Sequence, residues 1–168
     1  MPVDYFLSLG SNIRPEENIV QAVDLLQAYG TLVAASEVYQ TPALGAEDQP
    51  DYLNAAVLLR SALAPEVFQA EAIPSVEHAL KRVRSEDKFA ARTIDVDIML
   101  AGLFVGRLGQ RDIPSQEIVE RPFVAIPLAE IAPDFMHPVL GLTLAEIARR
   151  FDPSEMTPRP DVRLGPAP

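Results

Sequence analysis

Cysteine is absent from the sequence, and its absence excludes several kinds of site at once. A chain of 168 residues without a thiol has no disulfide framework, no thiolate metal centre and no cysteine nucleophile. No apolar run approaches the roughly 20 residues that span a bilayer. We also expect no signal peptide, because Asp4 interrupts the N-terminus and no basic stretch precedes an apolar core. These absences together predict a cytoplasmic protein.

Basic residues are also scarce, and they are unevenly distributed. Fourteen Lys and Arg stand against 24 Asp and Glu, and the net charge of −10 argues against nucleic acid or an anionic membrane as a partner. Residues 1–80 hold two of the basic residues, whereas residues 81–121 hold eight. This concentration allows two interpretations, one local anion site or a chance cluster of charges on a solvated face.

What the sequence does contain is an ordered series of apolar segments. Their patterns predict strands at 3–9, 32–39, 52–59 and 94–101, and helices at 15–30 and 65–84. Pro74 lies in the middle of the second helix, where it removes a backbone donor and should kink or split the helix. The order strand–helix–strand–strand–helix–strand predicts an α+β fold with a ferredoxin-like βαββαβ core.

Beyond the last of these strands we expect a C-terminal extension. Residues 123–132 form an apolar segment broken by Pro127, and residues 143–151 form a short amphipathic helix. The length of the chain fits one domain, which we place at residues 1–151. Residues 152–168 are rich in proline, and we expect them to form a loose tail.

Asp95 and Asp97 are the sharpest candidates for a functional site. They lie two positions apart in a strand, so both carboxylates point to one face while Val96 points into the opposite, apolar layer. Adjacent carboxylates repel each other unless they are protonated, hydrogen-bonded or bridged by a cation. Mg²⁺ suits such oxygen ligands and is usually held by one or two carboxylates together with phosphate oxygens. The alternative interpretation is a solvated strand face with two ordinary charges.

A cluster of cations precedes the two aspartates. Five basic residues fall within 12 positions, namely Lys81, Arg82, Arg84, Lys88 and Arg92. Guanidinium groups bind the outer oxygens of a polyphosphate while a metal ion neutralises its bridging oxygens, so the cluster and the aspartates together favour a polyphosphate site. The sequence contains neither Gly-x-x-x-x-Gly-Lys-Ser/Thr nor Gly-x-Gly-x-x-Gly, so this is not a P-loop enzyme.

Several strings of residues carry a resemblance to one family. They are Lys88-Phe-Ala-Ala-Arg92-Thr-Ile-Asp95-Val-Asp97-Ile-Met, Leu9-Gly10-Ser11-Asn12, Tyr39-Gln-Thr41-Pro42-Ala-Leu44-Gly45, Asp48-Gln49-Pro50-Asp51-Tyr52-Leu53-Asn54-Ala55, Arg82-Val-Arg84, and Arg121-Pro-Phe123 followed by Pro127-Leu128-Ala-Glu130-Ile131-Ala132-Pro133. Over about residues 3–150 the chain resembles the 6-hydroxymethyl-7,8-dihydropterin pyrophosphokinases of folate biosynthesis. The resemblance implies a Mg²⁺-dependent enzyme that transfers pyrophosphate from ATP to a pterin alcohol and releases AMP.

The resemblance also implies a role for each matching residue. Asp95 and Asp97 would hold two Mg²⁺ ions that bridge the ATP phosphates, and they would act in catalysis with Arg82 and Arg92. The implied ATP-binding residues are Glu77, Arg82, Arg84, Arg92, Ile98 and Arg121. The implied pterin-binding residues are Thr41, Pro42, Leu44, Tyr52, Asn54 and Phe123. Without the resemblance, Tyr52 and Phe123 would be interpreted as core aromatics and Asn54 as a turn amide.

The implied reaction is an in-line attack of the pterin hydroxymethyl oxygen on the β-phosphorus, helped by positioning and electrostatics. The polar loops 41–50 and 84–92 are natural lids, because two substrates must enter and water must be excluded. The expected partners are the pterin and ATP, with no nucleic acid and no membrane, and the chain is expected to be a monomer or a weak homodimer.

Departures from the family pattern gather on the nucleotide side. They are Pro74, Phe89, Gln110, Asp112 and Ser115, with Arg111 one position away from the arginine that the family carries. An aspartate beside a triphosphate is electrostatically unfavourable. Two further hypotheses therefore stay open, a pterin-binding paralogue with lost or altered nucleotide chemistry and a non-enzymatic regulatory module that binds a ligand.

Overall fold

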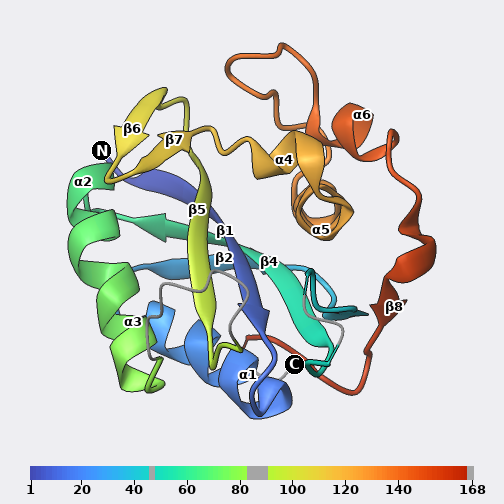
Figure 1. Cartoon of the computed structure of the whole chain (residues 1–168). Coiled ribbons are helices and arrows are strands. Elements are labelled where there is room, and N and C mark those ends of the chain that lie inside the picture. Colours follow the sequence, from blue (N-terminus) through green and yellow to red (C-terminus); the bar gives the residue numbers. More distant parts are fainter. Residues whose placement is uncertain (46–47, 83–90, 166–168) are drawn as a thin grey trace.

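An antiparallel sheet forms the centre of the computed structural model, which describes residues 1–45, 48–82 and 91–165. The strands lie in the order β5-β1-β4-β3-β8, and β2 pairs with β4 as well (Figure 1). Their bounds are β1 Val3–Ser11, β2 Thr31–Ala35, β3 Tyr39–Thr41, β4 Tyr52–Ser61, β5 Asp95–Ala101 and β8 Thr157–Pro158. This strand order, with a helix after the first and third predicted strands, confirms the ferredoxin-like α+β fold.

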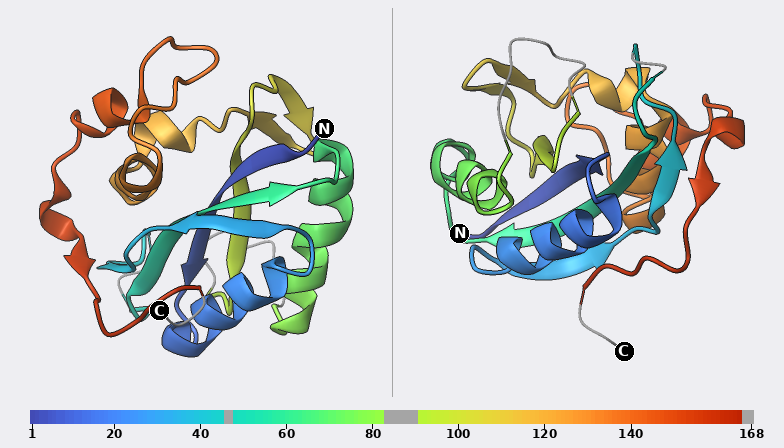
Figure 2. Two further views of the ribbon diagram at one scale, coloured as in Figure 1. Left: turned by 180° about the vertical axis from the view of Figure 1, so that it is seen from behind. Right: turned by 60° about the horizontal axis from the view of Figure 1, so that its bottom comes forward.

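Helices α1 (Pro15–Leu26) and α3 (Ile73–Ala79) cover one face of this sheet (Figure 2). The second predicted helix is divided into α2 (Pro65–Val67), the π-helical turn η1 (Phe68–Ala72) and α3, which confirms the split expected at Pro74. Because proline has no N–H, it cannot bond to the carbonyl four residues earlier, and the irregular turn η1 lies in the residues that precede Pro74.

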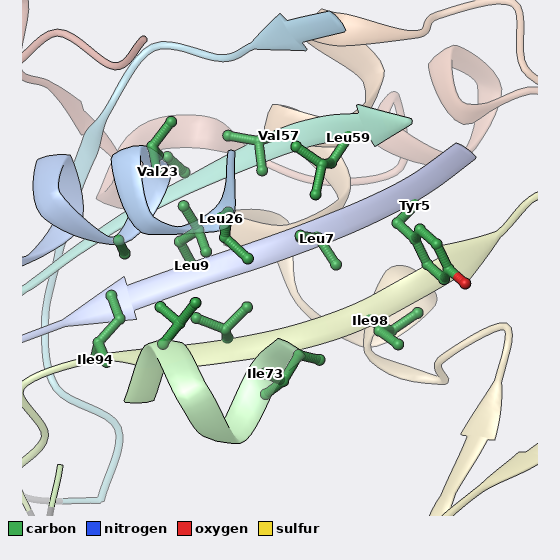
Figure 3. Close-up of a cluster of buried hydrophobic side chains, with 14 of the residues drawn as sticks. Tyr5, Leu7, Leu9, Val23, Leu26, Val57, Leu59, Ile73, Ile94 and Ile98 are labelled. Atoms are coloured by element: carbon green, nitrogen blue, oxygen red, sulfur yellow. The ribbon is translucent and has the colours of Figure 1, made fainter. Parts of the chain in front are cut away.

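The main core lies between these helices and alternate residues of the strands. Figure 3 shows Leu7 and Leu9 of β1 and Val57 and Leu59 of β4 meeting Leu26 of α1. All five side chains are at most 1% exposed. The period-2 alternation of the strands therefore puts one set of side chains into this core and leaves the intervening set for the opposite face.

The C-terminal helices α5 (Pro122–Ile131) and α6 (Leu144–Ala148) cover half of the opposite face of the sheet. Their buried side chains form a second apolar cluster with Phe6 of β1 and with Ala56 and Leu58 of β4. The remaining elements are the hairpin of β6 (Gly106–Leu108) and β7 (Arg111–Ile113), α4 (Glu117–Glu120) and the 3₁₀ turn η2 (Pro153–Glu155). The other half of this face carries polar residues. Within the described residues, no helix is both long and apolar enough to cross a membrane.

Strand 32–39 is interrupted by a serine. β2 ends at Ala35, β3 begins at Tyr39, and both pair with β4 as expected. Between them the Ser36 hydroxyl oxygen accepts a hydrogen bond from the Ala56 N–H at 2.9 Å, and the Ser36 N–H donates to the Ala56 carbonyl at 2.9 Å. The serine side chain thus replaces a strand acceptor where the backbone turns away.

Pro127 does not break the apolar segment at 123–132, so this expectation is wrong. Helix α5 runs without interruption from Pro122 to Ile131 and contains Pro127. The proline costs the helix one backbone hydrogen bond. Val124, Ala125 and Leu128 are each at most 2% exposed against the sheet and α6, and this packing outweighs the loss.

Residues 152–165, the part of the expected tail that the structure describes, do not form a loose tail, which corrects a second expectation. β8 pairs with β3, and the Arg159 N–H donates to the Val38 carbonyl at 2.8 Å. Met156 and Val162 are 7% and 8% exposed. A proline-rich composition disfavours a helix, but it does not prevent edge pairing or the burial of single apolar side chains.

Candidate functional site

The polar half of the sheet face is built by strand alternation. In the register of β1 with β5, Ser8 lies opposite Asp97 and Gly10 lies opposite Asp95. In the register of β1 with β4, the same Gly10 lies opposite Asn54. The neighbouring residues in each strand point into the main core, so these polar residues are forced onto the other face, beside the area that α5 leaves uncovered.

A pocket of ≈ 370 Å³ lies over this polar half. Strands, loops and the start of α5 contribute its lining residues, which are Ser8, Gly10, Thr41, Pro42, Leu44, Tyr52, Asn54, Arg92, Asp95, Asp97, Arg111, Glu117, Arg121, Phe123 and Val124. One end is lined by neutral and aromatic groups and the other by carboxylates and guanidinium groups. We call them the neutral end and the charged end.

At the charged end, Asp95 is held between two arginines. Arg82 Nη1 lies 2.9 Å from one carboxylate oxygen, and Arg92 Nη1 lies 2.9 Å from the other. The Arg82 side chain is only 9% exposed and also forms an ion pair with the buried Glu77. Glu77 in turn accepts a hydrogen bond from the Val96 N–H at 3.2 Å. Glu77 and Arg82 therefore lie behind Asp95 and fix its position from the core side.

Asp97 is the aspartate of the pair whose charged form is disfavoured by its surroundings. Burial is the main cause that raises the pKa of its carboxyl group well above the usual range, and the neighbouring Asp95 raises it further. Arg111 opposes this shift, with Nη2 3.0 Å from Asp97 Oδ1. The two carboxylates repel each other, and guanidinium groups lie in the same pocket. This arrangement fits a divalent cation that is bound together with phosphate oxygens.

Arg111 reaches the pocket while Asp112 points away from it. β7 is extended, so successive side chains alternate. Arg111 binds Asp97 and also Glu117, at 3.3 Å, whereas the Asp112 side chain is 78% exposed and lies 3.8 Å from Arg107. The electrostatic objection raised by Asp112 is therefore wrong, because its carboxylate does not face the site.

Ser115 also lies outside the pocket wall. Its N–H donates to the Met99 carbonyl at 2.9 Å, and its hydroxyl oxygen accepts from the Glu117 N–H at 3.2 Å. The serine therefore links the strand that carries both aspartates to the start of α4. Gln110 and Pro74 are exposed and do not line the pocket, and Phe89 lies outside the described residues.

At the neutral end, the buried polar side chains form a hydrogen bond with each other. The Asn54 amide donates to the Thr41 hydroxyl oxygen at 2.6 Å, and both residues are at most 6% exposed. A Cβ at Gly10 would lie 3.2 Å from Asn54 Oδ1 and 3.6 Å from the Tyr52 ring, so glycine keeps this end open. Burial raises the pKa of the Tyr52 hydroxyl, which therefore stays neutral.

The walls beside these groups are apolar. Tyr52 from β4 and Phe123 from α5 both line the pocket, and among the described residues their rings make no contact with each other. Leu44 on the loop after β3 is 47% exposed at the rim. A flat, mostly apolar ring with polar edges fits this end, since aromatic walls bind its faces and the amide its edge.

The structure brings together most, but not all, of the residues predicted for the site. The pocket wall includes Thr41, Pro42, Leu44, Tyr52, Asn54, Arg92, Asp95, Asp97, Arg121 and Phe123. Glu77 and Arg82 contact the site through Asp95. Ile98 is fully buried in the main core, on the face opposite the aspartates, so its side chain cannot line the pocket. Arg84 falls outside the described residues.

Sequence reasoning missed five residues of the pocket wall, which are Ser8, Gly10, Arg111, Glu117 and Val124. Alternation in β1 could have identified Ser8 and Gly10, because Leu7 and Leu9 are apolar. In β7, Arg111 has the same parity as the apolar Ile113, so alternation could have placed Arg111 inward and Asp112 outward. For Glu117 and Val124 no local signal exists, since helices α4 and α5 are brought to the pocket by tertiary packing.

Comparisons with known proteins agree on one family. A sequence model described as 7,8-dihydro-6-hydroxymethylpterin-pyrophosphokinase (HPPK) matches residues 6–133. A 2-amino-4-hydroxy-6-hydroxymethyldihydropteridine pyrophosphokinase of Synechocystis sp. is 36% identical, over 95% of this chain and 82% of that protein. A protein of the same name from Methylorubrum extorquens is 39% identical, over 89% of this chain and 94% of that protein.

Solved structures show the same fold. A crystal structure of Plasmodium falciparum HPPK-DHPS with pteroate superimposes with a TM-score of 0.68 at 14% identity. It is matched over 89% of this chain and 43% of that chain, so the present chain spans less than half the length of that protein. At this identity the likeness supports the fold alone.

Proposed function

This chain belongs to the 7,8-dihydro-6-hydroxymethylpterin-pyrophosphokinase family, and on that premise we propose that it transfers pyrophosphate from ATP to 6-hydroxymethyl-7,8-dihydropterin in folate biosynthesis. The hydroxymethyl oxygen forms a new bond to the β-phosphorus. The bond from that phosphorus to the α,β-bridging oxygen breaks, AMP leaves with this oxygen, and the hydroxymethyl proton is lost. The observation that carries the proposal is a single pocket with one neutral aromatic end and one charged end.

In this proposal the neutral end binds the pterin. Tyr52 and Phe123 hold the faces of the ring, and the Asn54 amide, fixed by Thr41, meets its polar edge. Pro42 and Leu44 cover the ring from the loop after β3. The ring is held by stacking and hydrogen bonds, which orient the hydroxymethyl group toward the charged end.

The charged end binds the triphosphate. Arg92, Arg111 and Arg121 line the pocket and supply guanidinium groups for the phosphate oxygens. Arg82 and Glu77 act as positioning residues, because neither lines the pocket, Arg82 binds Asp95 and Glu77 binds Arg82. We infer that Arg84 and the backbone of Ile98 contribute further nucleotide contacts.

Asp95 and Asp97 would hold Mg²⁺, with two ions expected. Both are oxygen ligands on one strand face, and the cost of ionising Asp97 is the cost that a bound cation removes. When bound, the metal neutralises phosphate charge that the arginines alone leave uncompensated. Arg111 must then exchange its contact with Asp97 for contacts with phosphate oxygens.

We also infer that residues 1–151 and the segment that pairs with β3 after them form one domain, and that the protein works in the cytoplasm as a monomer or weak homodimer. Sedimentation of the purified chain distinguishes the two oligomeric states. A stable trimer or larger assembly would contradict this part of the proposal.

Release of AMP tests the function directly. The chain is incubated with ATP, Mg²⁺ and 6-hydroxymethyl-7,8-dihydropterin, with omission of the pterin as a control. We expect AMP in proportion to pterin pyrophosphate. No AMP at high enzyme concentration would overturn the proposal, and tight pterin binding together with weak ATP binding would then identify a pterin-binding paralogue.

A further inference from the structure

Asn12 occupies a junction that the proposed chemistry does not use. It follows β1 directly, is 2% exposed and does not line the pocket. Its N–H donates to the Arg92 carbonyl at 3.1 Å, and its Oδ1 accepts from the Arg92 N–H at 2.8 Å. Its Nδ2 donates to Gln49 Oε1 at 2.9 Å and to the Pro50 carbonyl at 3.3 Å. One buried side chain thus joins three segments that are far apart in sequence.

The two segments that Asn12 joins to β1 serve opposite ends of the pocket. Gln49 and Pro50 lie on the loop between β3 and β4, and Pro42 and Leu44 of the same loop line the neutral end. Arg92 lies at the charged end, where its guanidinium group binds Asp95 at 2.9 Å. A displacement of either segment therefore strains hydrogen bonds to the same amide group.

We propose that Asn12 is a positioning residue that couples the two ends, so that a ligand at one end strengthens binding at the other. This inference rests on the proposed function only for the identity of the ligands. A ligand that fixes Arg92 also fixes Asn12, and through Nδ2 it orders the loop that receives the second ligand. Because coupling is reciprocal, the pterin must strengthen nucleotide binding by the same factor.

The side chain chemistry offers variants that separate the two links. Asn12→Asp keeps the acceptor for the Arg92 N–H but replaces the Nδ2 donor with a second acceptor, which faces the Pro50 carbonyl. Asn12→Ala removes both links. Asn18→Ala is the matched control. The Asn18 side-chain amide donates to the Ile13 carbonyl, next to Asn12 in sequence, at 2.6 Å, and none of the described hydrogen bonds of Asn18 reaches Arg92 or residues 49–50.

The decisive measurement is the pterin Kd with and without Mg²⁺ and a non-hydrolysable ATP analogue. Coupling free energies commonly correspond to about 5- to 150-fold changes in affinity. We expect such a factor in the wild-type protein and in Asn18→Ala, and a factor near one in Asn12→Asp and Asn12→Ala. We expect Asn12→Asp to retain wild-type affinity for the nucleotide alone, because its contact with Arg92 remains.

A second readout needs only the nucleotide. Amide hydrogen exchange of residues 48–53 should slow when the analogue binds to wild-type protein and should not respond in Asn12→Asp. Wild-type coupling retained in both Asn12 variants, or no coupling in a wild-type protein that binds both ligands, would overturn the role of Asn12. A wild-type protein that does not bind the pterin contradicts the proposed function instead, and the exchange experiment still decides whether Asn12 links the two segments.

Discussion

The two ends of the pocket differ in how far their polar and charged groups are compensated by neighbouring residues. At the neutral end, the Asn54 amide already has its partner in Thr41 before a ligand arrives. At the charged end, Asp97 lies largely buried beside Asp95, and Arg111 only partly compensates the cost. The difference indicates that the polar group of the neutral end is fixed in advance, whereas the charged end is completed by the cation and phosphates that it binds.

Removal of an acidic ligand should have the largest effect. Asp97→Ala should abolish Mg²⁺-dependent ATP binding and reduce AMP formation by about 10³-fold, because charge stabilisation at a reacting phosphate is worth several kcal/mol. Isothermal titration with ATP and Mg²⁺ checks the binding, and pterin binding without nucleotide is the control. Unchanged nucleotide affinity would remove the metal assignment from Asp97.

A smaller loss should follow the change of one cation at the same end. Arg111→Gln should weaken ATP binding by about 10- to 100-fold, because a hydrogen bond to a charged group contributes about 1.5–3 kcal/mol. Asp112→Asn is the matched control and should stay within about twofold of wild type, as expected of an exposed substitution. A larger effect of Asp112→Asn than of Arg111→Gln would contradict the orientation in which Arg111 faces the pocket and Asp112 faces solvent.

At the neutral end we expect a change confined to the pterin. Phe123→Ala should raise the Kd for the pterin by about 5- to 100-fold, since stacking of a ring on an aromatic side chain is worth about 1–3 kcal/mol. The affinity for ATP alone should be unchanged. Phe123→Tyr preserves the ring and serves as control. Equal losses for both ligands in Phe123→Ala would show that the two ends are not separable in this way.

The smallest effect concerns stability in the absence of metal. The folded-state pKa of Asp97 lies above its ordinary value of 3.8, so the folded state binds this proton more tightly than the unfolded chain. Stability must therefore fall as the pH rises from about 4 through the raised pKa. Asp97→Asn removes this cost and should raise the Tm of the metal-free protein at pH 8 by about 2–4 °C.

The same variant should show little difference from wild type at about pH 3, below the ordinary pKa of 3.8, where Asp97 is mostly protonated in both the folded and the unfolded chain. Thermal scans in a chelator at both pH values make the comparison. A Tm of Asp97→Asn below that of wild type at pH 8 would show that the contact with Arg111 outweighs the burial of the charge.

The sequence was sufficient for those features that depend on local alternation. The strands at 3–9 and 52–59 and the shared face of Asp95 and Asp97 follow from apolar residues at every second position. The fold was predictable for this reason, whereas most of the pocket wall was predicted only through the resemblance to the family. Pro127 inside α5 was not, because its cost is outweighed by packing that depends on the rest of the fold.

The orientation of individual side chains at the charged end was less predictable. Arg111 and Asp112 are adjacent, and a position-by-position comparison with the family pattern points to Asp112, whereas Arg111 is the residue that lines the pocket. Their directions are set by the β6–β7 hairpin, which the sequence pattern did not reveal. The Ile98 side chain lies outside the pocket for a simpler reason, since Ile98 has the opposite parity to Asp95 and Asp97 in the same strand.

The two-residue strand β8 has a consequence unrelated to ligands. An uncovered strand edge presents unpaired N–H and C=O groups that a neighbouring chain can join, which is a common route to aggregation. Tyr39 and Gln40 of β3 are paired with Pro158 and Thr157, and the Arg159 side chain further fixes Gln40 at 2.9 Å. We therefore expect a chain that lacks this short segment to expose the edge of β3 and to self-associate more readily at high concentration.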